Sequence, residues 1–110
     1  MKEIKAYVRK EKADIVIEKL EAAGVKGMTV LDANALAEWA DKNAFSFSIE
    51  YVEKYSTVVK LEIVCDDSDT DKLVNVIAKY GRTGKPGDGM IFISSINSSL
   101  KIRTGEKNVF

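Results

Sequence analysis

The chain has 110 residues, enough for one domain with a hydrophobic core, spanning residues 1–110. Its 17 Lys and Arg residues balance 17 Asp and Glu residues, so the net charge does not support nucleic-acid binding. There is no histidine and only one cysteine, Cys65, which excludes histidine-based catalysis, histidine zinc sites and an intrachain disulfide.

The first third of the chain is predicted to form a strand, a helix and a second strand. Residues 2–9 alternate, with Ile4, Ala6 and Val8 on one side, which indicates a half-buried strand. Residues 12–23 change to a helical period, and Gly24 provides a natural helix end. Residues 28–31 form the next predicted strand.

The central segment, residues 32–55, follows neither period over its full length. Residues 34–42 are good helix formers, whereas residues 44–49 are aromatic and β-prone. Such a long connection in a small domain is usually functional or disordered. Its aromatic residues Trp39, Phe45 and Phe47 either pack back onto the domain or anchor a partner protein, and the sequence leaves both open.

The second half of the chain again follows the order strand, helix, strand. Residues 58–65 alternate, and Cys65 on their apolar side is expected to be a buried, inert thiol. A helix runs to about Tyr80, where Gly81 ends it, and a strand over residues 90–96 follows. A polar turn then leads to a short final strand over residues 101–103.

Four acidic residues precede the second predicted helix: Asp66, Asp67, Asp69 and Asp71. Their spacing does not match an EF-hand calcium loop, so we expect them to cap the helix rather than to bind a metal.

This order of elements predicts an α+β fold, a ferredoxin-like βαββαβ sandwich with a long loop between strands 2 and 3 and a short extra C-terminal strand. Both helices would cover one face of an antiparallel sheet. The other face keeps Tyr7, Phe92 and Ile96 among polar residues, and such a face is best covered by other subunits. No apolar run reaches the length of a membrane span and no signal-peptide pattern is present, so we expect a cytoplasmic protein without membrane insertion.

A glycine-rich loop and a pair of cations are the candidate binding features. Gly84, Gly87 and Gly89 crowd one loop, whose bare peptide N–H groups can form an anion-binding nest. Lys101 and Arg103 lie two apart, so on a strand they point to the same face. Together they suit a phosphate-bearing ligand, although an ordinary turn and a solvated strand face would have the same pattern.

The run Thr83-Gly84-Lys85-Pro86-Gly87-Asp88-Gly89, with Ile102-Arg103-Thr104-Gly105-Glu106 downstream, closely resembles the signature of the PII nitrogen-regulatory signalling proteins. The resemblance extends to residues 25–30, 50–51 and 60–64. It implies a homotrimer that binds an adenine nucleotide (ATP, ADP or AMP) in clefts between subunits. Such a protein is not an enzyme; it regulates a transporter or an enzyme through its central loop, about residues 35–55. Whether Mg²⁺ accompanies the nucleotide stays open.

The resemblance also implies roles for individual residues. The phosphates would be faced by Gly87, Asp88, Gly89 and Arg103, with assistance from Lys85 and Lys101. The adenine or ribose wall, contributed by the other subunit, would comprise Gly27, Met28 and Thr29, with Glu62 and Val64 near the base. The partner-contact loop would present Trp39, Phe45, Phe47 and Tyr51, and Tyr51 lies where many bacterial relatives are uridylylated.

Several positions depart from the family pattern. Relatives carry glycines and a glutamine at the root of the loop and a lysine before the third strand, where this chain has Ala35, Ala37, Trp39 and Val58. These changes remove polar groups that help hold Mg-ATP and 2-oxoglutarate, so 2-oxoglutarate sensing in the usual manner is not expected. Met90 replaces a usual lysine and Lys101 a usual arginine, so ADP or AMP should compete well with ATP.

Two other functions remain as alternatives. A small phosphohydrolase resembling acylphosphatases would use Arg9 at the end of the first strand, although the following loop lacks the glycines of a phosphate cradle. A metal-responsive trimer resembling the copper-tolerance proteins would have to bind metal through carboxylates.

Overall fold

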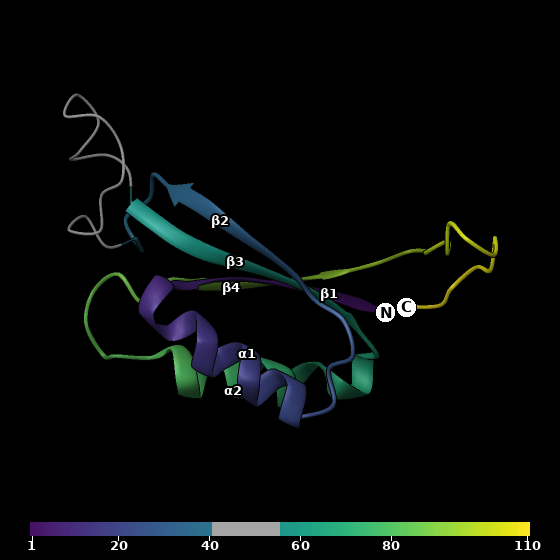
Figure 1. Cartoon of the computed structure of the whole chain (residues 1–110), viewed down its shortest axis with the longest axis horizontal. Helices are drawn as coiled ribbons and strands as arrows, with labels where there is room; N and C mark the ends of the chain where they lie inside the picture. The colour runs from purple at the N-terminus through teal and green to yellow at the C-terminus, as the bar shows by residue number, and fades with distance from the viewer. Residues whose placement is uncertain (41–55) are drawn as a thin grey trace.

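The computed structural model describes residues 1–40 and 56–110 of the chain (Figure 1). The strands are β1 (Lys2–Arg9), β2 (Thr29–Ala35), β3 (Ser56–Cys65) and β4 (Met90–Ser95), and the helices are α1 (Ala13–Ala22) and α2 (Thr70–Gly81). Short 3-10 helices, η1 (Lys10–Lys12) and η3 (Asp67–Asp69), precede the two α-helices. The predicted order βαββαβ is therefore confirmed.

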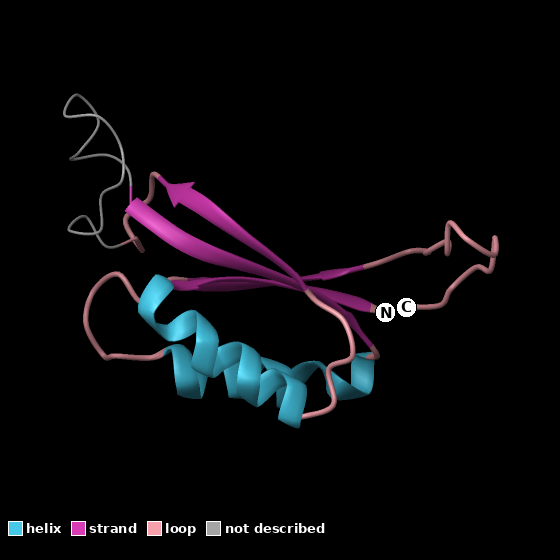
Figure 2. Ribbon diagram, in the orientation of Figure 1, coloured by secondary structure: helices cyan, strands magenta, loops and turns pink. Residues whose placement is uncertain are grey.

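The four strands form one antiparallel sheet in the order β2-β3-β1-β4. β1 is central and pairs with β3 along its whole length, from Lys2 opposite Cys65 to Arg9 opposite Val58. Both helices lie on the same face of this sheet, as Figure 2 shows, which leaves the other face open within one chain. This arrangement is the α+β, ferredoxin-like sandwich that the sequence predicted.

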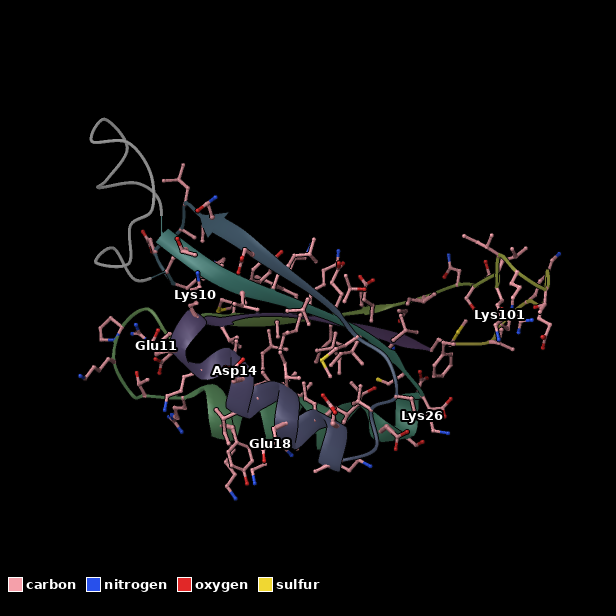
Figure 3. All side chains as sticks on the ribbon, viewed as in Figure 1. Lys10, Glu11, Asp14, Glu18, Lys26 and Lys101 are labelled. Carbon is pink, nitrogen blue, oxygen red and sulfur yellow. The ribbon has the colours of Figure 1, made fainter. Side chains whose placement is uncertain are left out.

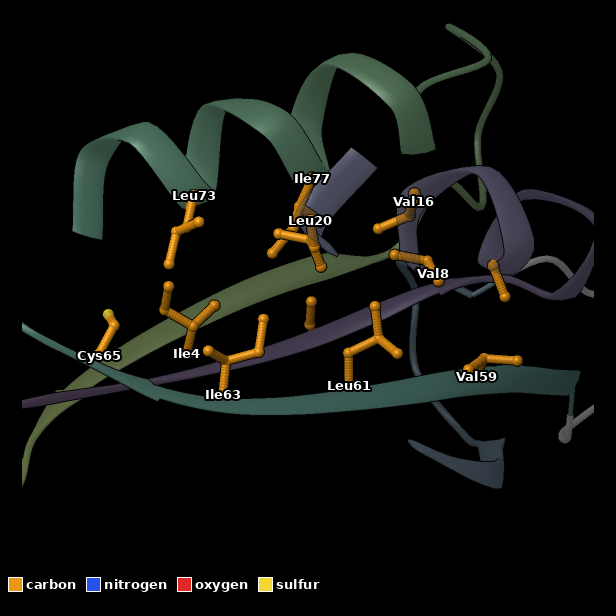
Figure 4. Close-up of a cluster of buried hydrophobic side chains, with 12 residues drawn as sticks. Ile4, Val8, Val16, Leu20, Val59, Leu61, Ile63, Cys65, Leu73 and Ile77 are labelled. Carbon is orange, nitrogen blue, oxygen red and sulfur yellow. The ribbon is translucent and has the colours of Figure 1, made fainter. Parts of the chain in front are cut away.

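The core lies between the sheet and the two helices (Figure 4). Alternate residues of β1 and β3 point into it because successive strand side chains face opposite sides. The largest side chains with almost no exposed surface are Ile4, Leu20, Leu61, Ile63, Ile77 and Val16. Cys65 is 5% exposed and joins this cluster as a free thiol, as expected.

β2 is longer than the sequence indicated. It continues through Asp32 and Asn34 to Ala35, because every residue from Thr29 onward pairs with a residue of β3. Main-chain pairing thus carries the strand through polar residues that obscured the periodicity. The helix formers that follow do not form a helix between residues 36 and 40.

The predicted C-terminal strand is wrong. Residues 102–104 form a turn, in which the Lys101 amide donates to the carbonyl of Glu106 and the Gly105 amide donates to that of Lys101, each at 2.8 Å. A single bridge joins Leu100 to Lys107. After β4 the chain leaves the sheet, and this C-terminal segment forms hydrogen bonds within itself. The two-residue spacing of Lys101 and Arg103 therefore did not indicate a strand.

The predicted capping by the acidic cluster is also wrong. Asp69 precedes α2 but makes no side-chain capping bond. Its carboxylate instead lies 3.8 Å from the Lys72 ammonium group, and Asp67 lies 3.0 Å from the N-terminal amine. That amine holds the pKa of Asp67 below its usual value, first by hydrogen bonding and then by charge. These carboxylates therefore have cationic partners rather than helix amides.

Candidate functional site

The glycine loop, residues 82–89, joins α2 to β4 and is closed around the carboxylate of Asp88. One carboxylate oxygen accepts from Arg9 Nε at 2.9 Å and from the Thr83 hydroxyl. The other accepts from the amides of Thr83 at 2.9 Å and Gly84 at 2.8 Å. The Asp88 carboxylate thus occupies amide donors of the loop that could otherwise bind an external anion, and its side chain links the two ends of the loop to Arg9.

The environment of Asp88 keeps this carboxylate charged. Burial alone would raise its pKa, but hydrogen bonds from Thr83, Arg9 and Gly84 outweigh that effect and hold the pKa of Asp88 far below its usual value. A negative charge of this kind repels phosphate. Asp88 can therefore face a phosphate group through its main chain, but its carboxylate is already engaged.

Arg9 fixes the loop to the end of β1. Its side chain is 9% exposed, and besides Asp88 it donates from Nη2 to the carbonyl oxygen of Pro86 at 2.7 Å. Nη1 lies 3.9 Å from the carboxylate of Glu11. The sequence suggested Arg9 only as a phosphohydrolase residue; the structure places its guanidinium in the support of the glycine loop.

Gly89 allows the loop to lie directly against β1. Its φ is +97°, and a Cβ atom there would lie 1.8 Å from the carbonyl oxygen of Tyr7. No side chain fits at this position. The Gly89 amide donates to the carbonyl oxygen of Trp39 at 3.3 Å, so the loop also contacts the central segment.

An aromatic cluster lies beside the loop on the open face of the sheet. The rings of Tyr7 and Trp39 are 5.2 Å apart between centroids, and those of Tyr7 and Phe92 are 6.1 Å apart. Lys60 Nζ lies 5.9 Å from the centroid of Tyr7. Of the two alternatives for Trp39, the structure has the ring packed back onto the domain. Phe45, Phe47 and Tyr51 lie outside the described residues.

A hollow of about 580 Å³ borders the glycine loop between α2 and β4. Asp88 and Gly89 line it together with Lys79 of α2 and Arg82, the first residue of the loop. These two cations were not among the predicted site residues. The position of Lys79 depends on how α2 packs, whereas Arg82 could have been noticed as a cation at the start of the glycine loop.

A pocket of about 650 Å³ lies at the other end of β1, between the α1–β2 connection and β3. All five residues predicted for the base wall line it: Gly27, Met28, Thr29, Glu62 and Val64. Lys26, Lys72 and Phe110 also border this pocket. The structure therefore brings these five predicted residues together.

The two halves of the predicted site are far apart in one chain. Glu62, the predicted base residue nearest the loop, lies opposite Lys5, and the four steps from Lys5 to Arg9 correspond to about 13 Å of strand. Lys101 lies at one end of the molecule, whereas Lys10 and Glu11, near the glycine loop, lie at the other end (Figure 3). Residues 101–106, including Lys101 and Arg103, are exposed. Within one chain, the glycine loop and Arg103 therefore do not meet.

The chain matches the family model described as nitrogen regulatory protein P-II over residues 1–106. Proteins named nitrogen regulatory protein P-II are similar over nearly the full length. That of Nostoc punctiforme is 39% identical, covering 98% of this chain and 96% of its own. That of Azospirillum brasilense is 36% identical, covering 97% of this chain and 96% of its own. This chain therefore belongs to the P-II family of nitrogen regulatory signalling proteins, which are regulators and not enzymes.

Proposed function

We propose that this protein binds an adenine nucleotide between copies of itself in a homotrimer and thereby regulates a transporter or an enzyme through residues 35–55. The observation that carries this proposal is that the glycine loop and the C-terminal turn lie at opposite ends of one chain (Figure 1), with the pocket residues between them along β1. A second copy that placed its pocket and C-terminal turn against the glycine loop would complete a site that one chain leaves divided.

The charges favour the same assembly. Arg103 and Lys101 are exposed on the C-terminal turn, where they are available to a neighbouring copy. The open sheet face bears apolar side chains that a second copy would cover, including Leu31, Met90 and Phe92, the last of which is 47% exposed. Three equal interfaces of this kind give three nucleotide clefts.

The pocket suits a purine base. Met28 and Val64 offer apolar contact, Gly27 has no side chain to obstruct the base, and Glu62 offers a carboxylate acceptor for an exocyclic amine. The phosphates would then face the main chain of Gly87, Asp88 and Gly89 and the guanidinium of Arg103, with Lys85 and Lys101 as further cations.

ADP and AMP are proposed to compete well with ATP, because Met90 offers no charge beside Gly89 for a third phosphate. Sensing of 2-oxoglutarate is not proposed. Trp39 offers one uncharged N–H donor on a ring that packs on Tyr7, and Val58 is 3% exposed and offers nothing polar, so the charge-assisted contacts that usually hold a dicarboxylate are missing.

Calorimetry with ATP, ADP and AMP tests the proposal, combined with the solution mass of the protein. We expect binding of at least one nucleotide to a trimer. Arg103→Ala should weaken ADP binding about 10- to 100-fold, since a charge-assisted bond to phosphate is lost. Lys107→Ala, another exposed cation near the same turn, is the matched control and should bind like the wild type. A monomeric protein, or one that binds none of the three nucleotides at millimolar concentration, would refute the proposal.

The alternatives have weaker support. The Arg9 guanidinium is bonded to Asp88 and Pro86, so it does not offer a cradle for an acyl phosphate. Within residues 1–40 and 56–110, no three acidic or cysteine side chains gather in a way that could hold a metal ion. In the same residues, no helix is long and apolar enough to cross a membrane.

A further inference from the structure

We propose that Trp39 is a positioning residue whose carbonyl oxygen competes with the phosphate of a bound ligand for the amide of Gly89. This inference rests on the proposed function, because it assumes that a phosphate-bearing ligand uses the glycine loop. An amide has one hydrogen to donate, and that of Gly89 is given to Trp39 across 3.3 Å.

The other donors near this end of the loop are held more firmly. The amides of Thr83 and Gly84 donate to the charged carboxylate of Asp88 at 2.9 and 2.8 Å, and the Lys85 amide donates to the Thr83 hydroxyl at 3.1 Å. The bond from Gly89 is longer and its acceptor is neutral, and such bonds are weaker than charge-assisted ones. A phosphate oxygen would therefore replace the Trp39 carbonyl more readily than the Asp88 carboxylate.

The indole ring holds the Trp39 carbonyl in place. It packs 5.2 Å from the ring of Tyr7 and against the small apolar cluster of Ala35, Ala40 and Val58. Tyr7 is also the residue whose carbonyl oxygen lies directly against Gly89. One residue of β1 thus supports both partners of the Gly89–Trp39 bond, so loss of the indole should loosen the carbonyl while Gly89 stays in place.

The competition works in both directions. Ligand binding at the loop would release the Trp39 carbonyl, and any contact that holds Trp39 on Tyr7 would weaken ligand binding by the same factor. The Gly89–Trp39 bond belongs to the antiparallel bridge between Ala40 and Asp88, so the backbone around Trp39 and Ala40 pairs with the loop. Trp39 and Ala40 belong to the central segment and are the last residues described before position 41, so they connect the glycine loop to that segment.

ADP calorimetry on the full-length protein tests this inference. Trp39→Ala keeps the carbonyl but removes the ring that holds it, so ADP should bind about two- to tenfold more tightly, the range expected from relief of one neutral hydrogen bond. Trp39→Phe keeps a ring over Tyr7 and should bind close to the wild type. Unchanged or weaker binding by Trp39→Ala, with the wild type binding ADP, would overturn the inference and leave the proposed function standing.

Two spectroscopic measurements complete the test. Trp39 is the single tryptophan of the chain, so ADP binding should change the tryptophan fluorescence emission of the protein. In the ligand-free protein, the Gly89 amide hydrogen should exchange with solvent faster in Trp39→Ala than in Trp39→Phe. The exchange measurement needs no nucleotide, so it decides the Gly89–Trp39 contact even if ADP fails to bind. Equal Gly89 exchange in the two variants, or ADP binding without any change in emission, would refute the role of Trp39.

Discussion

The glycine loop and the C-terminal turn were both expected to hold phosphate, yet the structure supports them in opposite ways. The loop is bonded to residues far away in sequence, with Arg9 and Asp88 lying 79 positions apart. The turn is closed by bonds among residues 99–109, and Ile102 within it is 95% exposed. The loop is therefore tied to the domain by long-range contacts, whereas the turn is exposed, as the proposed contact with a second copy requires.

The largest expected effect comes from filling the space at Gly89. A Cβ atom there would lie 1.8 Å from the carbonyl oxygen of Tyr7, and φ is +97°. Gly89→Ala should lower the free energy of unfolding by about 3 kcal/mol or more, since backbone strain and a steric clash combine. Urea unfolding would measure this. Gly105→Ala in the C-terminal turn, with φ of +74° and open space around it, should cost only about 1 kcal/mol. Equal costs at the two positions would remove the contrast between loop and turn.

The next effect concerns the Arg9–Asp88 pair. Asp88→Asn keeps the size of the side chain but removes the charge that four donors share, among them the buried Arg9 guanidinium at 2.9 Å. We expect a loss of about 2 kcal/mol, below the range for fully buried pairs because Asp88 is partly exposed. Asp69→Asn, at an exposed pair with Lys72, should cost about 0.5 kcal/mol or less. A loss at Asp88 no larger than that at Asp69 would show that the loop does not depend on this pair.

The same carboxylate makes a prediction about pH. The pKa of Asp88 is lowered in the folded protein, so its stabilising effect is complete above the ordinary aspartate pKa of about 4 and is lost as pH falls further. The difference in unfolding free energy between the wild type and Asp88→Asn should therefore be constant from neutral pH to about 5 and shrink below about 4. Urea unfolding at a series of pH values measures it, and a difference that grows on acidification would contradict the assignment.

The smallest stability effect is expected in the C-terminal turn. Arg103→Ala should change the free energy of unfolding by about 0.5 kcal/mol or less, because the side chain is exposed and outside the core. Its effect belongs to nucleotide binding, as set out above. A large loss of stability measured by urea unfolding of the ligand-free protein would mean that Arg103 supports the assembly itself.

The amino-acid sequence by itself determined the elements whose signals are local. Alternation placed Ile4, Ala6 and Val8 on the buried side of β1, and the helical period with a terminal glycine located both helices. The PII signature identified the family. These features depend on neighbours within a few positions, so a pattern in the chain is sufficient to find them.

Only the tertiary structure decided what the loop and the turn contact. Arg9 reaches Asp88, and Trp39 reaches Gly89, across the sheet and between segments that no periodicity relates. The same dependence on distant partners explains the wrong strand at residues 101–103, where alternating cations were present but the segment bonded to itself. A strand forms only where another strand can pair with it, and an ion pair forms only where an oppositely charged side chain lies nearby. Tertiary packing decides both, and spacing along the chain does not.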